Sequence, residues 1–104
     1  MLGPMKDALS TAYLDRISEI LKGVLGTRKY EVYLFGSRAR GDARLESDID
    51  IGILADDPLR RELSVAREEL EESTVPLLVD LVDLRDAPAI LKRVQEEGVL
   101  LWSN

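Results

Sequence analysis

The chain has 104 residues, a formal net charge of −6, and neither cysteine nor histidine. This length predicts a single domain over residues 1–104, and the missing residue types exclude disulfides, thiolate or imidazole metal sites, and a histidine general base. The negative charge argues against a protein that grips extended nucleic acid, because such proteins hold phosphates with many Lys and Arg side chains.

The sequence also contains no predicted targeting or membrane segment. The first residues include no apolar run long enough for a signal peptide, and no stretch approaches the roughly 20 apolar residues of a membrane helix. We therefore expect a cytoplasmic protein without a membrane partner, and the absence of cysteine fits that compartment.

The first predicted elements are a helix over residues 7–24 and a strand over residues 30–35. Asp7 is the expected N-cap of the helix, and β-branched and aromatic residues favour the strand. Apolar residues of the helix recur at spacings of three and four, which predicts one buried face packed on a sheet. These residues are Leu9, Tyr13, Ile17, Ile20, Leu21 and Val24.

The next segment, residues 36–53, contains the main functional pattern. Gly36 and Ser37 form a predicted turn, and residues 38–46 are expected as a loop or as one helical turn opening at Ser37. In a strand over residues 47–54, alternation places Asp48 and Asp50 on one face. Two such carboxylates repel each other unless a cation lies between them, and Mg²⁺ prefers oxygen ligands. Because the turn could bind phosphate oxygens, the pattern predicts phosphoryl or nucleotidyl transfer.

Two further helices are predicted from their capping residues. Asp57 is expected as the N-cap of the first, with Pro58 at the first helical position. Asp86 is expected to cap the last helix, which has Pro88 in its first turn and ends at Gly98. The expected buried residues of the two helices are Leu59, Leu63, Ala66 and Leu70 in the first and Ile90, Leu91 and Val94 in the second.

A third strand is predicted over residues 75–84, and it is apolar on both faces, as is typical of an interior strand. Asp80 interrupts the apolar run and has no evident structural role unless it meets a cation. Asp83 lies on the opposite face, where we expect it to bond to the backbone of a turn. Residues 99–102 are either a fourth short strand or an apolar tail against a partner.

Gly36-Ser37, ten residues, and then Asp48-Ile49-Asp50 resemble the signature of the DNA polymerase β-like nucleotidyltransferase superfamily, and within it the minimal nucleotidyltransferases. The resemblance implies an α/β (α+β) fold of the polymerase β-like type, with a mixed sheet of three to four strands and helices packed on one face. The family pattern also includes a third carboxylate on a later strand, and Asp80 matches it better than Asp83.

The resemblance implies a transferase that moves a nucleoside monophosphate, AMP from ATP, to a hydroxyl group. Asp48, Asp50 and Asp80 would be the catalytic residues and would hold two Mg²⁺ ions, as in two-metal sites. Asp80 is the nearest candidate for the general base. Gly36 would allow close backbone approach, and Ser37 would contact the β- or γ-phosphate.

Two arginines extend the expected nucleotide-binding site. Arg38 and Arg40 could neutralise charge on the leaving group. Either arginine could instead pair on the surface with Asp42 or Glu46, and the sequence leaves both readings open for each.

The acceptor is not encoded in any recognisable segment, so it is expected on a partner or in a cleft of a homo- or hetero-oligomer. Minimal nucleotidyltransferases resemble antitoxins whose partner is a HEPN ribonuclease toxin, and this implies AMPylation of a toxin tyrosine. Three alternatives stay open. One is transfer to a small-molecule hydroxyl, as in the related aminoglycoside enzymes, and another is a non-catalytic antitoxin that only binds its toxin. The third is a nucleotide-binding subunit of a larger enzyme.

Overall fold

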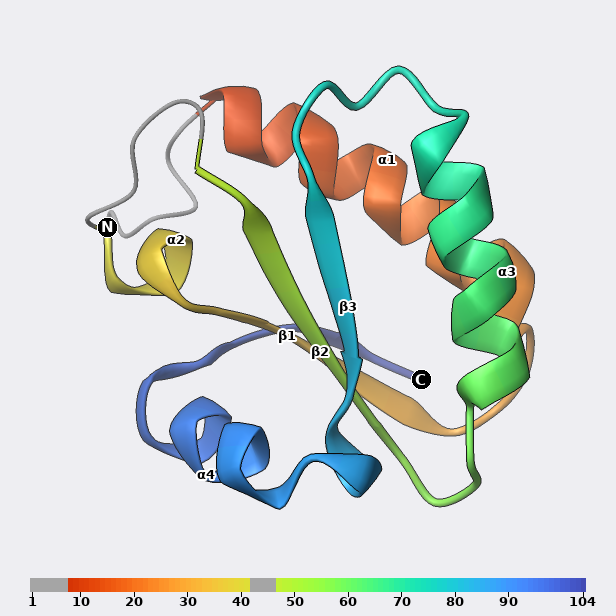
Figure 1. Ribbon diagram of the computed structural model, residues 1–104, viewed down its shortest axis with the longest axis vertical. Coiled ribbons are helices and arrows are strands. Elements are labelled where there is room, and N and C mark those ends of the chain that lie inside the picture. The colour runs from red at the N-terminus through yellow and green to blue at the C-terminus, as the bar shows by residue number, and fades with distance from the viewer. Residues whose placement is uncertain (1–7, 42–46) are drawn as a thin grey trace.

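The computed structural model describes residues 8–41 and 47–104 of the chain. The helices are α1 (Ala8–Leu25), α2 (Ser37–Arg40), α3 (Arg60–Glu71) and α4 (Pro88–Glu97), with a 3-10 turn, η2 (Leu84–Asp86), before α4 (Figure 1). The strands are β1 (Tyr30–Phe35), β2 (Ile49–Ala55), β3 (Val79–Asp83) and β4 (Val99–Ser103). The first predicted helix and strand are confirmed, whereas Asp7 lies outside the described residues.

The strands form one mixed sheet in the order β3-β2-β1-β4. β1 pairs antiparallel with both β2 and β4, and β2 pairs parallel with β3. The predicted mixed α/β fold is therefore confirmed. Of the two readings of residues 99–102, the structure supports the fourth strand.

β3 is an edge strand, so the predicted interior position is wrong. The sheet is extended at its other side, where β4 joins β1, and this leaves β3 next to β2 alone. Leu78, just before β3, is 74% exposed. The Arg67 guanidinium donates to the backbone oxygen of Leu81 at 2.7 Å, and this bond occupies one polar group of the exposed edge.

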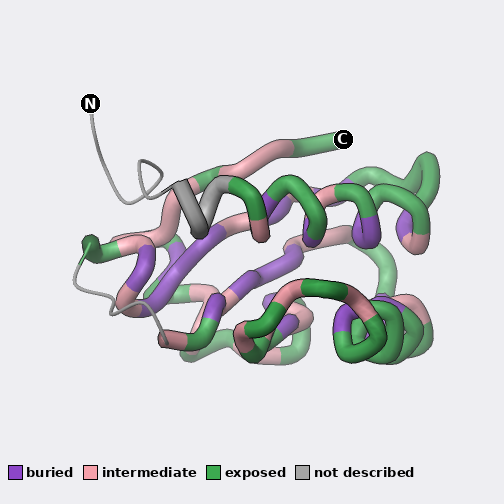
Figure 2. Tube along the Cα trace, turned by 90° about the horizontal axis from the view of Figure 1, so that it is seen from above, coloured by how far each residue is buried: buried purple, intermediate pink, exposed green. Residues whose placement is uncertain are grey.

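α1 and α3 pack on one face of the sheet and form the larger core. Ile49, Ile51 and Ile53 alternate along β2 and are fully buried against these helices. Burying each such side chain stabilises the fold by about 1.5–3 kcal/mol. Figure 2 shows buried residues along the strands and exposed ones on the outer surfaces of the helices. The predicted buried stripe of α3 is confirmed: Leu59, Leu63, Ala66 and Leu70 are all buried.

α4 and η2 pack on the opposite face, over a smaller core of Phe35, Leu84 and Val94. The prediction of helices on one face therefore holds for α1 and α3 but not for α4. Successive side chains of β1 point to opposite faces of the sheet. Tyr33 and Phe35 therefore point away from the α1 face and form a second apolar surface.

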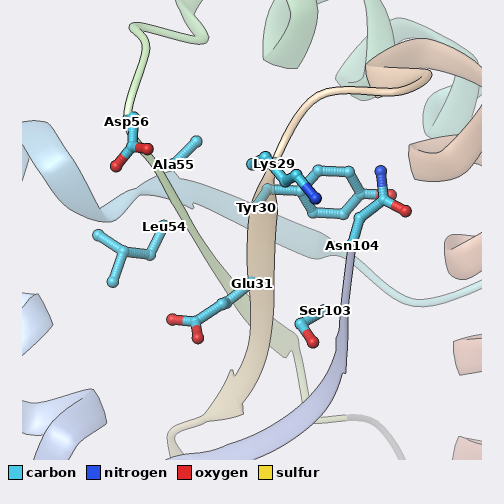
Figure 3. Close-up of a pocket in the computed structure, with 8 residues that line it drawn as sticks. All are labelled: Lys29, Tyr30, Glu31, Leu54, Ala55, Asp56, Ser103 and Asn104. Atoms are coloured by element: carbon cyan, nitrogen blue, oxygen red, sulfur yellow. The ribbon is translucent and has the colours of Figure 1, made fainter.

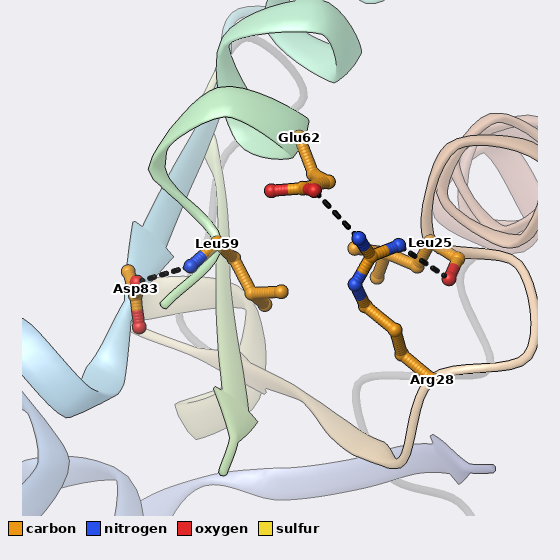
Figure 4. A network of polar contacts seen from close by, with 5 residues as sticks. All are labelled: Leu25, Arg28, Leu59, Glu62 and Asp83. Atoms are coloured by element: carbon orange, nitrogen blue, oxygen red, sulfur yellow. Dashed lines mark hydrogen bonds and ion pairs between the residues drawn. The ribbon is translucent and has the colours of Figure 1, made fainter. Parts of the chain in front are cut away.

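The start of α3 differs from the prediction. Its N-cap is Leu59, not Asp57, because the Leu59 side chain is fully buried and carries the chain inward before the helix begins. The Leu59 N–H donates to the Asp83 carboxylate at 3.3 Å, as drawn in Figure 4. In the same view Arg28 forms an ion pair with Glu62 at 2.8 Å.

The start of α4 also differs, because Ala87 and not Asp86 is the N-cap. Asp86 is part of η2, whose own N-cap, Asp83, accepts a hydrogen bond from the Arg85 N–H at 3.2 Å. The backbone role predicted for Asp83 is thus confirmed. Gly98 ends α4 as predicted. Within residues 8–41 and 47–104, no helix is both long and apolar enough to cross a membrane.

Candidate active site

The turn after β1 brings the backbone of Gly36 against the side chain of Asp50. Gly36 has a φ of 76°, a conformation that residues with a Cβ rarely adopt. A Cβ at this position would lie 2.2 Å from the Asp50 Oδ2 atom. Ser37 then opens α2, a single turn closed by the bond from the Gly41 N–H to the Ser37 carbonyl oxygen at 3.0 Å. Glycine is therefore required here both by φ and by contact.

Three aspartates lie at this end of the sheet. Asp50 is the register partner of Phe35 in β1 and of Asp80 in β3. Asp48 lies just outside β2, because the observed strand begins at Ile49, two residues later than predicted. Ile49 is the first residue to pair, and its N–H donates to the Leu78 oxygen at 2.9 Å. Asp48 and Asp80 are exposed, whereas Asp50 is partly buried.

The charges of Asp80 and Asp48 act on the carboxylate of Asp50. Burial raises the pKa of Asp50 above its ordinary value, and the negative charges of Asp80 and Asp48 raise it further. Arg93 and Arg40 act in the opposite direction. A site of this kind favours a bound cation, because a positive charge between carboxylates removes their mutual repulsion.

The donor set fits magnesium in its chemistry, since every group offered is a carboxylate oxygen. In the described part of the chain, however, no three acidic side chains converge closely enough to hold one ion together. The backbone register makes Asp50 and Asp80 neighbours, but the two do not form such a group with Asp48.

The two arginines near the turn have different environments. Arg38 is only 5% exposed, and its Nε and Nη2 atoms both donate to the Ser47 carbonyl oxygen, at 3.3 and 2.8 Å. Arg40 is more exposed, and its Nη1 atom lies 3.2 Å from the Glu97 carboxylate of α4. The surface partners predicted for these arginines, Asp42 and Glu46, lie outside the described residues.

The sequence analysis did not identify Arg93 of α4, whose positive charge lowers the pKa of Asp50. Glu97 follows Arg93 by four residues, so the two side chains lie on the same side of α4. Nothing in the local sequence indicates that this side of α4 turns toward Asp50, because that depends on how α4 packs on β1.

A hollow of about 510 Å³ opens at the other end of the strands, away from the aspartates. Figure 3 shows its lining, which includes Lys29, Glu31 and Asp56. β1 begins and β2 ends at this hollow, whereas Phe35 and Asp50 lie at the opposite ends of those strands. The hollow is therefore separate from the carboxylate site.

The sequence of this chain matches the family model described as polymerase beta, nucleotidyltransferase, over residues 16–104. The chain therefore belongs to the polymerase beta nucleotidyltransferase family, and the resemblance inferred from its motif is confirmed.

Among curated proteins, the chain is similar to the protein adenylyltransferase MntA of Shewanella oneidensis, with 44% identity over 77 residues, which are 70% of this chain and 53% of that protein. It is also similar to the probable protein adenylyltransferase MntA of Haemophilus influenzae, with 40% identity over 83 residues, which are 71% of this chain and 70% of that protein. The matched part of the chain thus spans about half the length of the Shewanella relative.

Two solved structures show the same fold. One is a toxin–antitoxin crystal structure with AMP-PNP, with a TM-score of 0.68, 37% identity, and coverage of 86% of this chain and 73% of that chain. The other is a complex of a tri-AMPylated Shewanella oneidensis HEPN toxin with an MNT antitoxin, with a TM-score of 0.61, 35% identity, and coverage of 86% and 69%.

Proposed function

We propose that this chain is an antitoxin that transfers AMP from ATP to a hydroxyl group of a partner HEPN toxin. The observation that carries the proposal is the position of Asp50, which lies against the Gly36 turn on one side and opposite Asp80 on the other. The names of the similar proteins support it, since they include protein adenylyltransferases and a complex with an AMPylated toxin. Residues 1–104 would act as one nucleotidyltransferase domain.

The proposed ligands of magnesium are Asp48, Asp50 and Asp80. When bound there, Mg²⁺ supplies positive charge that activates the acceptor hydroxyl and stabilises the departing phosphates. The raised pKa of Asp50 supports this assignment, because a site that penalises carboxylate charge gains most from a cation.

The residues of the chain have distinct roles in the proposed reaction. Gly36 lets the triphosphate approach the backbone closely, and the Ser37 hydroxyl donates to a phosphate oxygen. Asp80 accepts the proton of the acceptor hydroxyl. The chain contains no histidine that could act as this base. The acceptor oxygen then bonds to the α-phosphorus, the bond from that phosphorus to the bridging oxygen breaks, and pyrophosphate leaves.

The experiment is intact-mass measurement of the product of the neighbouring gene, which the proposal expects to be a HEPN toxin, after incubation with the purified protein, ATP and Mg²⁺. The toxin should gain the mass of one or more AMP groups, and peptide mapping should place them on hydroxyl side chains. The gain should disappear with EDTA and with Asp50→Asn. Asp56→Asn, at the opposite end of the sheet, controls for the loss of one acidic charge.

The proposal is rejected if the toxin mass stays unchanged while the protein binds ATP and the toxin. Transfer to the toxin by Asp50→Asn at the wild-type rate would instead reject the assigned site.

A further inference from the structure

The edge strand β3 leaves one side of the carboxylate site accessible. The Gly36 turn follows β1, Asp50 lies on β2, and Asp80 lies on β3, so the three follow one another across the sheet. β3 is the last strand on this side of the sheet in the described part of the chain. A group that approaches Asp80 from outside the sheet therefore passes over β3 and the residues before it, on the side away from the Gly36 turn. Figure 1 shows this segment running from α3 to the start of β3.

The residues just before Asp80 expose apolar side chains beside this route. Pro76 and Leu78 are exposed, whereas Leu77 and Val79 are partly buried and pack against the larger core. Because alternate side chains of a strand lie on one face, Leu78 shares the face of Asp80. Leu78 is 74% exposed, which is the highest value of any large apolar side chain in the described residues.

Backbone hydrogen bonds hold this segment in place. The Leu78 carbonyl oxygen accepts from the Ile49 N–H at 2.9 Å, so Leu78 lies beside Asp48, one position before the register pair of Ile49 and Val79. Further back, the Ser73 hydroxyl donates to the Leu70 carbonyl oxygen at 2.6 Å. Single exposed apolar residues are common on protein surfaces, but this one is fixed next to two of the proposed magnesium ligands.

A hollow of about 320 Å³ lies between the end of α3 and the segment before β3. Its lining includes residues 75–79 together with Arg67 and Glu71 of α3. The end of α3 is acidic and exposed, with Glu68, Glu69, Glu71 and Glu72 all open to solvent. The surface beside Asp80 thus combines apolar and acidic side chains, which suits a partner segment that brings an apolar side chain and a Lys or Arg.

We propose that the surface formed by Glu71, Pro76 and Leu78, here called the edge surface, docks the protein segment that carries the acceptor hydroxyl. An apolar side chain of that segment contacts Leu78, and a basic one pairs with Glu71. The inference rests on the proposed function and deepens it, because it assigns the place where the partner is held. The Gly36 turn and the edge surface lie on opposite sides of Asp50, so ATP and the acceptor reach the carboxylates without competing for space.

The first test uses the absence of cysteine from the sequence. Leu78→Cys introduces a single thiol, and mass spectrometry measures how fast a maleimide alkylates it, with and without the purified product of the neighbouring gene. With this partner at ten times its Kd, alkylation should slow about tenfold, because only the unbound chain reacts. Leu100→Cys is the matched control. Leu100 is 51% exposed on β4, at the opposite edge of the sheet, and the partner should not change its rate.

The second test measures AMP transfer to the same partner. Leu78→Ala should raise the KM for the partner by roughly tenfold, as expected for an apolar contact at the centre of an interface. It should leave kcat and the affinity for Mg-ATP unchanged, because the lost contact is made equally in the ground and transition states and does not involve the nucleotide. Leu100→Ala should leave all three quantities unchanged.

The acidic part of the edge surface is tested separately. Glu71→Gln should raise the KM for the partner by about threefold at low salt, and the difference should shrink as salt screens the charges. Glu69→Gln removes the same charge from the other side of α3, since two residues of a helix turn the side chain by about 200°, and it should have no effect.

The inference is overturned if the partner leaves the alkylation rate at position 78 unchanged, if it slows alkylation equally at positions 78 and 100, or if Leu78→Ala transfers AMP with the KM of the wild type. Alkylation at position 78 that slows with rising concentration of the chain alone would identify a second copy as the occupant, and would also overturn it. A wild-type chain that adds no AMP to the partner would instead overturn the proposed function, so the two failures are distinguishable.

Discussion

Asp50 of β2 and Asp80 of β3 occupy the same register position on two parallel strands. Parallel pairing places the two Cα atoms side by side, so two acidic residues distant in sequence become neighbours. The resulting repulsion raises the pKa of Asp50 together with its burial. Two neighbouring acidic residues reduce the stability of a sheet. Their position side by side is explained if a cation is bound between them.

The pH dependence of stability follows from this pair. The pKa of Asp50 is raised in the folded protein, so above its ordinary pKa of 3.8 the folded state binds more protons than the unfolded chain. Stability therefore falls as pH rises through the window from the ordinary to the raised pKa, and the penalty remains above that window. We expect Asp50→Asn to unfold at a higher temperature than the wild type at neutral pH without Mg²⁺.

This difference should disappear well below the ordinary pKa of 3.8, at about pH 3 and lower, where Asp50 is protonated in both states. Thermal unfolding followed by circular dichroism over a pH series measures it, with Asp56→Asn as a control for net charge. If Asp50→Asn proved less stable than the wild type at neutral pH, the prediction would be contradicted.

Gly36→Ala should destabilise the fold and abolish ATP binding. The substitution forces a Cβ onto a residue with positive φ, and this Cβ would overlap the Asp50 Oδ2 atom at 2.2 Å. Gly26→Ala is the matched control, because Gly26 also has positive φ but a Cβ there would meet no atom within 4 Å.

Backbone strain alone should reduce the free energy of unfolding of Gly26→Ala by about 1–2 kcal/mol. The contact with Asp50 should make the loss in Gly36→Ala larger by about 1–3 kcal/mol. Urea unfolding measures both losses. Equal losses with intact ATP binding would show that a Cβ at position 36 does not clash with the Asp50 side chain.

Arg38→Ala and Arg40→Ala should separate stability from nucleotide binding. Loss of the buried Arg38 removes two hydrogen bonds to Ser47 and should lower the free energy of unfolding by about 1.5–3 kcal/mol. Loss of Arg40 removes a partly exposed ion pair and should change it by less than about 1 kcal/mol, while it weakens Mg-ATP. Urea unfolding measures stability and calorimetry measures Mg-ATP binding. If Arg40→Ala lost the stability and Arg38→Ala lost the binding, the two roles would have to be exchanged.

The double substitution Asp48→Asn with Asp50→Asn should abolish toxin neutralisation in cells while leaving the complex with the toxin intact. Both substitutions keep side-chain volume and remove only the charge that the proposed magnesium site requires. Growth after toxin induction and co-purification of the pair are the two measurements. Full neutralisation by this variant would favour an antitoxin that acts by contact alone.

Local pattern accounts for much of what could be predicted. The alternation in β1, the helical stripe of Ile17 and Leu21, and the turn at Gly36 each depend on residues close together in the chain. The helix starts were predicted less well. Asp57 and Asp86 are suitable caps by composition, but burial of Leu59 and the 3-10 turn before Ala87 shift both starts.

The sequence by itself determined the family, the spacing of the turn and the Asp48–Asp50 pair, and the alternation that places these aspartates away from the core. Only the tertiary structure decided that Asp80 lies opposite Asp50 on an edge strand, that Arg38 is buried, and that the charge of Arg93 on α4 lowers the pKa of Asp50. Strand register and the side of a helix that meets a site depend on contacts between segments far apart in the chain, and no local pattern encodes those contacts.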